Sequence, residues 1–201
     1  MTQQPLLLAI AAIAGYLLGS LSFSILLSQS PYKDDIRNHG SGNAGMTNML
    51  RTFGKWAAVL VFAGDFFKGT GAVLIGRALA GETGGLLAAL CAVVGHLFPL
   101  YFGFRGGKGV STAAGCILGL YPPVLLVLLP LFLAIVFVSR YVSLGSLVVA
   151  AAYPVTVWLM GCSVPQIVTA VVIGGLVIWR HRANIGRLRS GTESKIGQKK
   201  T

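Results

Sequence analysis

The residues of this sequence that could do chemistry gather first in a glycine-rich loop at residues 35–51. Besides its glycines, the loop holds hydroxyl and amide side chains: Gly40, Ser41, Gly42, Asn43, Gly45, Thr47 and Asn48. Small residues let backbone N–H groups converge on an anion, and a helix start nearby adds a favourable dipole. Arg51 adds a planar cation that suits phosphate. We expect an anion-binding loop; a flexible polar loop with glycine turns is the alternative.

A second glycine-rich loop follows at residues 104–112. Two cations stand among its glycines: Arg105, Gly106, Gly107, Lys108 and Gly109. The loop is not a Walker A motif, because Phe102 stands where that motif needs glycine and Gly109 follows the lysine. It still places two cations on a glycine backbone just before an apolar run. We therefore expect a second anion-binding loop; His96, just before it, fits a structural role better than a catalytic one.

Two later polar pieces complete the set. Ser143 follows a short turn with Arg140, and His181 and Asn184 stand three residues apart, on one face if the last apolar run continues as a helix. A basic cluster that attracts anionic lipid is the alternative for the final piece. We assign that role to the tail lysines Lys195, Lys199 and Lys200.

Asp65 and Lys68 lie near the middle of an apolar run. Charges inside a membrane are costly, so they pair with each other or serve a function. An internal pair at this spacing is the simpler interpretation. A membrane transporter of an organic phosphate would also use such a pair, and this is the alternative function.

The loops that carry these residues lie between apolar runs that predict membrane helices. Of the 201 residues 55% are hydrophobic and 10% charged, with a mean hydropathy of +0.78. Soluble domains carry roughly 25% charged residues. The net charge of +11 does not indicate nucleic-acid binding, because the basic residues sit in short pieces between apolar runs. We predict an all-α polytopic membrane protein with one domain, residues 1–201.

Apolar runs and charge predict seven transmembrane helices. The predicted spans are residues 6–27, 56–75, 86–102, 110–120, 124–138, 142–160 and 164–179. Residues 110–138 could form one span or two, since Pro122 and Pro123 interrupt them. Two spans leave most basic loops on one side, with only Arg77 outside, as the positive-inside rule favours. The N-terminus is then outside and the C-terminus cytoplasmic.

Several of these segments closely resemble the PlsY family, the bacterial acyl phosphate:glycerol-3-phosphate acyltransferases. The matching segments keep the family's order and spacing over nearly the whole chain: Gly40-Ser41-Gly42-Asn43, Thr47-Asn48, Gly106-Gly107-Lys108-Gly109-Val110, Tyr141-Val142-Ser143-Leu144 and Arg180-His181-Arg182. The resemblance implies seven membrane helices with an active site at the cytoplasmic face of the bacterial inner membrane. It implies acyl transfer from acyl phosphate to the 1-hydroxyl of glycerol 3-phosphate, giving lysophosphatidic acid, the first acylation in phospholipid synthesis.

The resemblance also implies roles for individual residues. Catalytic roles are expected for Lys108, Arg51, His181 and Asn184. Substrate binding is expected for Ser41, Gly42, Asn43, Gly45, Thr47, Asn48, Gly106, Gly107, Gly109 and Ser143. The expected partners are glycerol 3-phosphate, acyl phosphate and membrane lipid.

The absence of familiar catalytic motifs agrees with an activated donor. The His-x4-Asp pattern of enzymes that use acyl-CoA or acyl carrier protein is missing, and so is a GxSxG nucleophile elbow. A mixed anhydride needs less help, because phosphate leaves readily; orientation and cations can then supply most of the rate. The proton acceptor stays open between the substrate's own phosphate, His181 and, more remotely, Asp35. No carboxylate cluster indicates a metal, and no cofactor is expected.

Overall fold

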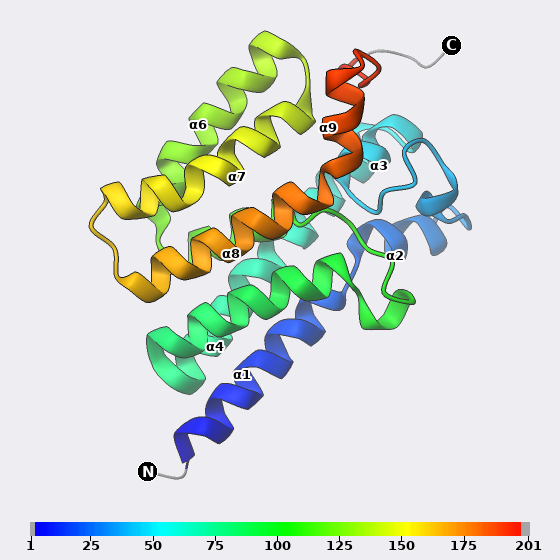
Figure 1. The fold of residues 1–201 in the computed structure, drawn as a ribbon. Helices are drawn as coiled ribbons and strands as arrows, with labels where there is room; N and C mark the ends of the chain where they lie inside the picture. Colours follow the sequence, from blue (N-terminus) through cyan, green and yellow to red (C-terminus); the bar gives the residue numbers. More distant parts are fainter. Residues whose placement is uncertain (1–2, 198–201) are drawn as a thin grey trace. The chain divides into compact units, whose positions relative to one another are not determined.

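The structure is a computed structural model that describes residues 3–197, and every regular element in that range is a helix (Figure 1). This confirms the all-helical fold for the described part of the chain. Lys199 and Lys200 lie outside the described residues. The chain divides into two compact units, one ending at Leu120 and the other beginning at Tyr121. The single domain expected from the sequence stays a prediction.

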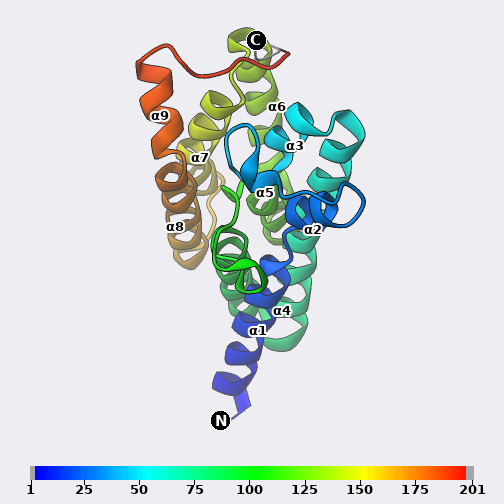
Figure 2. The same ribbon diagram turned by 90° about the vertical axis from the view of Figure 1, so that its right-hand side faces the viewer.

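In the first unit a broken helix packs against a long one. Helix α1 (Gln3–Ser20) is separated from α2 (Phe23–Gln29) by two residues. Both views show α1 alongside α4 (Lys55–Leu97) (Figures 1 and 2). Small residues allow this approach, since a Cβ added at Gly15 or Gly19 would meet the backbone of α4. Glycines that bring helix backbones close are a usual device of membrane helix packing.

Helix α4 turns back on itself at a sharp break. Ala80 and Gly81 leave helical geometry, with φ of −143° and +63°, and the second value is one that glycine tolerates best. A Cβ at Gly76 would meet the carbonyl oxygen of Gly84, so the two halves lie against each other on either side of the break. The predicted spans 56–75 and 86–102 therefore fall in two separate helical halves of α4, on either side of this break.

Short elements between the long helices carry the two glycine loops. The first loop contains η1 (Ile36–Asn38) and α3 (Met46–Thr52). The second contains η2 (Leu100–Phe102) and ends at α5 (Val110–Leu120). The first loop is anchored by apolar side chains that are fully buried together with α2 and α4: Ile25, Ile36, Ala44, Met49, Ala57 and Val61. Burying apolar surface fixes a loop that glycine would otherwise leave mobile.

Arg77 fixes the far end of α5. Its guanidinium donates to the carbonyl oxygens of Gly119 and Leu120, each at 2.7 Å. These are carbonyls of the last turn, which lack partners within the helix and carry its negative dipole end. Arg77, the one basic residue that the positive-inside rule does not explain, therefore has a structural function.

The second unit is a row of antiparallel helices. Helix α6 (Pro122–Ser139) packs on α7 (Val142–Leu159), and α7 packs on α8 (Val164–Arg180). Helix α9 (Arg182–Arg189) follows α8 with a bend of 57°, and the change of direction is visible in Figure 1. Residues 110–138 thus form two helices, and their boundary falls at the proline pair.

Four helical segments of the described chain are long and apolar enough to cross a membrane: Gln3–Gln29, Lys55–Phe102, Pro122–Ser139 and Val142–Leu159. The bent pair α8 and α9 raises the number to five if it counts as one span. Helix α5 is apolar but has 11 residues, short of the roughly 20 that cross a bilayer. The chain is a multi-pass membrane protein, and the count of seven spans stays a prediction.

Candidate active site

Asn48 holds the first glycine loop in shape. Its side-chain oxygen accepts from the N–H of Ser41 at 3.1 Å, and its amide nitrogen donates to the carbonyls of Ile36 and His39 at 3.1 and 2.9 Å. The residue is 1% exposed. Both the oxygen and the nitrogen of this side-chain amide, which the sequence predicts to bind substrate, thus have partners within the loop. We assign Asn48 a positioning role.

Four of the glycine N–H groups in the two loops bond to nearby carbonyls, so these four do not converge on an anion as the sequence suggests. Gly42 donates to the carbonyl of His39 at 2.9 Å, and Gly45 to that of Asn43 at 3.1 Å. In the second loop, Gly106 and Gly107 donate to carbonyls at the end of α4. These four N–H groups shape the loops instead of forming an anion cradle, because a backbone this tightly turned bonds to itself. The positive φ of Gly40 and Gly42 permits the turn.

The two glycine loops touch each other. A Cβ added at Gly107 would meet both His96 Nε2 and the carbonyl oxygen of Ala44, so no side chain fits there. A Cβ at Gly106 would meet the carbonyls of His96 and Leu97. Gly106 and Gly107 are therefore needed for close packing. The contact brings the donor side chains of residues 41–47 and Lys108 into the same region of the first unit.

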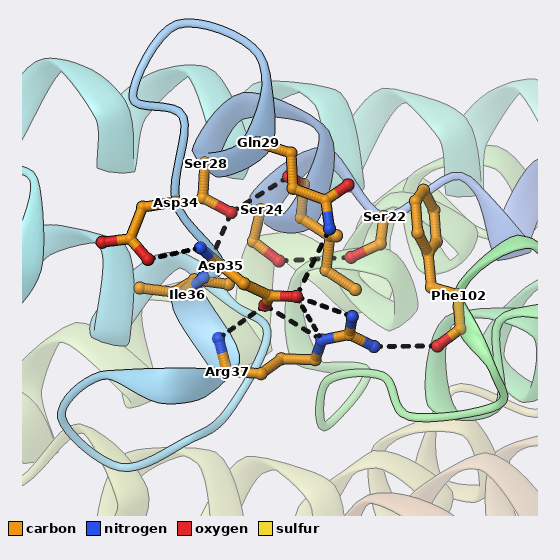
Figure 3. Close-up of polar contacts among 10 residues, drawn as sticks. Ser22, Ser24, Ser28, Gln29, Asp34, Asp35, Ile36, Arg37 and Phe102 are labelled. Atoms are coloured by element: carbon orange, nitrogen blue, oxygen red, sulfur yellow. Dashed lines mark hydrogen bonds and ion pairs between the residues drawn. The ribbon is translucent and has the colours of Figure 1, made fainter.

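Arg37 ties the first loop to the second from the other side. It donates Nε and Nη2 to the Asp35 carboxylate at 2.7–3.1 Å and Nη1 to the carbonyl of Phe102 at 2.8 Å (Figure 3). Hydrogen bonds from Arg37 lower the pKa of Asp35 to about 2, against the raising effect of burial. Such a carboxylate is a poor proton acceptor, so Asp35 is unsuitable as the base. The sequence reasoning missed Arg37, whose signal was the spacing Asp-x-Arg.

Behind the second loop lies a buried polar cluster. Lys68 Nζ is 2.7 Å from Asp65 Oδ1, 2.7 Å from the carbonyl oxygen of Leu21 and 3.0 Å from His96 Nδ1. The three side chains are 6% exposed or less. The i, i+3 pair expected from the sequence is confirmed, and His96 joins it.

In the second unit, three polar side chains donate to one carboxylate. Ser143 and Asn184 donate to Glu193 Oε1 at 2.8 and 2.7 Å, and Arg187 donates to Oε2 at 2.6 Å. Burial raises the pKa of Glu193, but these three hydrogen bonds together hold it below its ordinary value. The structure thus brings together Ser143 and Asn184, as the sequence suggests, but around a residue that sequence reasoning missed. Its only signal was an acidic residue isolated in a basic tail.

His181 is oriented by its own helix. Its Nδ1 is 2.7 Å from the carbonyl oxygen of Val177. A carbonyl only accepts, so Nδ1 carries a proton and Nε2 is the basic nitrogen of the neutral ring. The ring is 2% exposed. The arrangement gives His181 the tautomer that a base acting through Nε2 requires.

The predicted residues thus divide between the units. Those of the glycine loops, with Arg51 and Lys108, lie in the first; Ser143, His181 and Asn184 lie in the second. Among residues 3–197, no group of three or more His, Cys, Asp and Glu side chains is placed to hold a metal ion.

This fold occurs in solved membrane enzymes. The chain is similar to the crystal structure of PlsY (YgiH), an integral membrane glycerol 3-phosphate acyltransferase, in its glycerol 3-phosphate form. The TM-score is 0.90 at 39% identity, with 94% of this chain and 96% of the other covered. The lysophosphatidic acid form gives a TM-score of 0.86 at 38% identity, with 94% of this chain and 95% of the other covered. The fold and these likenesses define an integral membrane acyltransferase.

Curated relatives extend the likeness. A glycerol-3-phosphate acyltransferase of Syntrophomonas wolfei is 46% identical, with 92% of this chain and 94% of the relative covered. One from Agrobacterium fabrum is 45% identical, covering 97% and 95%. The family model described as glycerol-3-phosphate acyltransferase matches residues 9–191. The chain belongs to this family, and its resemblance to PlsY is confirmed.

Proposed function

We propose that this protein transfers an acyl chain from acyl phosphate to the 1-hydroxyl of glycerol 3-phosphate, giving lysophosphatidic acid and inorganic phosphate. This is the first acylation of bacterial phospholipid synthesis. The observation that carries the proposal is the contact of the two glycine loops at Ala44 and Gly107, which gathers neutral donors and Lys108 in one region. The relatives' names supply the acceptor. The donor follows from the chemistry below.

The reaction needs little covalent help from the protein. The glycerol hydroxyl oxygen attacks the acyl carbon, the bond from that carbon to the phosphate oxygen breaks, and phosphate leaves with the electron pair. Two anionic reactants must meet, and their like charges repel unless cations are held nearby. We assign this electrostatic role to Lys108 and Arg51, and we assign phosphate and hydroxyl contacts to Ser41, Asn43 and Thr47.

The hydroxyl proton has two acceptors within this proposal. The phosphate of glycerol 3-phosphate can take it directly, and His181 Nε2 is the side-chain alternative, because Nδ1 is engaged with Val177. Asn184 and Ser143 hold the second unit's polar residues in place through Glu193. The glycines at positions 42, 45, 106, 107 and 109 shape the loops around the substrates.

We propose seven membrane spans, with the N-terminus outside and the C-terminus in the cytoplasm. Both glycine loops then face the cytoplasm, where glycerol 3-phosphate is available, and the acyl tail stays in the lipid of the inner membrane. The distribution of basic residues supports this orientation. Exposed tryptophans near the helix ends, Trp56, Trp158 and Trp179, suit membrane interfaces.

Donor choice tests the proposal. Purified protein in detergent is given glycerol 3-phosphate with palmitoyl phosphate or palmitoyl-CoA, in the presence of a chelator, and products are followed by mass spectrometry. We expect 1-acylglycerol 3-phosphate and stoichiometric phosphate from the acyl phosphate alone. Efficient turnover of acyl-CoA would refute the proposed donor. Turnover in detergent also excludes transport as the origin of phosphate release, because transport needs a sealed compartment.

A further inference from the structure

The buried cluster of Asp65, Lys68 and His96 gives a charged Lys68 one partner for each of its N–H groups. An ammonium has three donors and no acceptor. Lys68 Nζ lies within 3.0 Å of three acceptor positions: Asp65 Oδ1, the Leu21 carbonyl oxygen and His96 Nδ1. Each donor of a charged Lys68 therefore has one acceptor. The Leu21 carbonyl can accept because the chain leaves helical geometry between α1 and α2.

The same geometry fixes the tautomer of His96. Since Lys68 donates to Nδ1, that nitrogen carries no proton, and the proton of the neutral ring is on Nε2. Nε2 faces the contact between the two glycine loops, because a Cβ at Gly107 would meet both Nε2 and the carbonyl oxygen of Ala44. The ring thus presents an N–H to the backbone that precedes Lys108. An ion pair serving only to neutralise buried charge would need no histidine between it and the loop.

We propose that Asp65, Lys68 and His96 form a positioning cluster that fixes the Gly106–Gly109 loop against Ala44 and thereby sets the affinity for glycerol 3-phosphate. Asp65 and the Leu21 carbonyl hold Lys68, Lys68 orients the imidazole, and the imidazole supports the loop at Gly107. None of the three touches substrate. The inference rests on the proposed function, because it assigns the loop to the phosphate-bearing substrate.

Two substitutions of His96 separate its two nitrogens. Asparagine keeps an acceptor near the Nδ1 position and withdraws the donor from the loop. Glutamine places an amide N–H near the Nε2 position and withdraws the acceptor from Lys68. We expect His96→Asn to raise KM for glycerol 3-phosphate about tenfold, the size of one lost positioning hydrogen bond, with little change in KM for acyl phosphate. We expect His96→Gln to keep KM for glycerol 3-phosphate within about threefold of the wild type. It should lower the thermal midpoint more than His96→Asn does, because Lys68 loses an acceptor.

The readouts are steady-state kinetics for both substrates and the rise of the thermal midpoint on adding glycerol 3-phosphate, which needs no turnover. Glu82→Gln is the control, because Glu82 is exposed and lies outside both glycine loops, so this change should leave both readouts unchanged. Equal loss of affinity for both substrates, or wild-type KM in His96→Asn, would overturn the inference. A tenfold rise of KM for glycerol 3-phosphate in His96→Gln would also overturn it. This second variant decides the question if His96→Asn does not fold. If the wild type itself neither binds nor acylates glycerol 3-phosphate, the proposed function fails, and the inference falls with it.

Discussion

Replacing Glu193 with alanine removes the acceptor that Ser143, Asn184 and Arg187 share. The carboxylate is 9% exposed, and its three hydrogen bonds join residues up to 50 positions apart. Ser143 lies at the start of α7 and Asn184 within α9, so Glu193 links these two helices to the tail. Without it, buried donors on both helices lose this acceptor.

The magnitude follows from the kind of each bond. The bonds from Ser143 and Asn184 to a carboxylate are charge-assisted, and each is worth roughly 1–2 kcal/mol. The bond from Arg187 is discounted to about 0.5 kcal/mol, because that side chain is 39% exposed and screened by solvent. We expect Glu193→Ala to destabilise the protein by about 2.5–4.5 kcal/mol. Glu193→Gln keeps an acceptor oxygen and should cost about half as much.

Unfolding of the purified protein by titration with a denaturing detergent measures these differences. Acyl transfer is measured on the same samples at a temperature where all variants remain folded. Glu82 is exposed, so Glu82→Ala is the matched control and should change neither quantity. We expect activity to fall in Glu193→Ala even when it is folded, since Asn184 and Ser143 lose their orientation. Wild-type stability and wild-type activity in Glu193→Ala would refute the reasoning.

Three further predictions concern other parts of the molecule. Lys108→Ala and Arg51→Ala should each lower the initial rate with glycerol 3-phosphate by at least about two orders of magnitude; near-normal rates in Lys108→Ala, with loss in a Lys199→Ala control, would contradict the assigned roles. A variant with Cys162 as its sole cysteine should react with an impermeant thiol reagent on intact cells, whereas a C-terminal tag that is reached from outside would contradict seven spans. Asp35→Asn should lower the thermal midpoint at neutral pH. The corresponding loss in the free energy of unfolding should be no more than about 1–2 kcal/mol. Because the folded pKa of Asp35 is lowered to about 2, this contribution is present above its ordinary pKa of 3.8 and is lost as pH falls toward 2; a difference between variant and wild type that persists at pH 2 would disprove it.

The pattern of residues is enough to predict the helical class, the membrane character and the loops that carry chemistry. Apolar runs specify helices because a backbone in lipid must satisfy its own hydrogen bonds. The proline pair at 122–123 marked the boundary between α5 and α6, and helix starts and ends were mostly located within a few residues. The spacing of Asp65 and Lys68 was enough to predict their pairing, because three residues along a helix bring side chains together.

How the predicted residues are held depends on long-range packing that the sequence does not reveal. His96 joins Lys68 across 28 positions, Ser143 meets Glu193 across 50, and Gly107 packs against Ala44. Such contacts leave no periodicity in the sequence, because they depend on how helices stack and where loops fold back. For the same reason, the sequence could not show that Asn48 holds its own loop and that the glycine N–H groups bond to carbonyls nearby. Local composition marks where a loop and its chemistry lie, and the packing around it decides which groups are left to act.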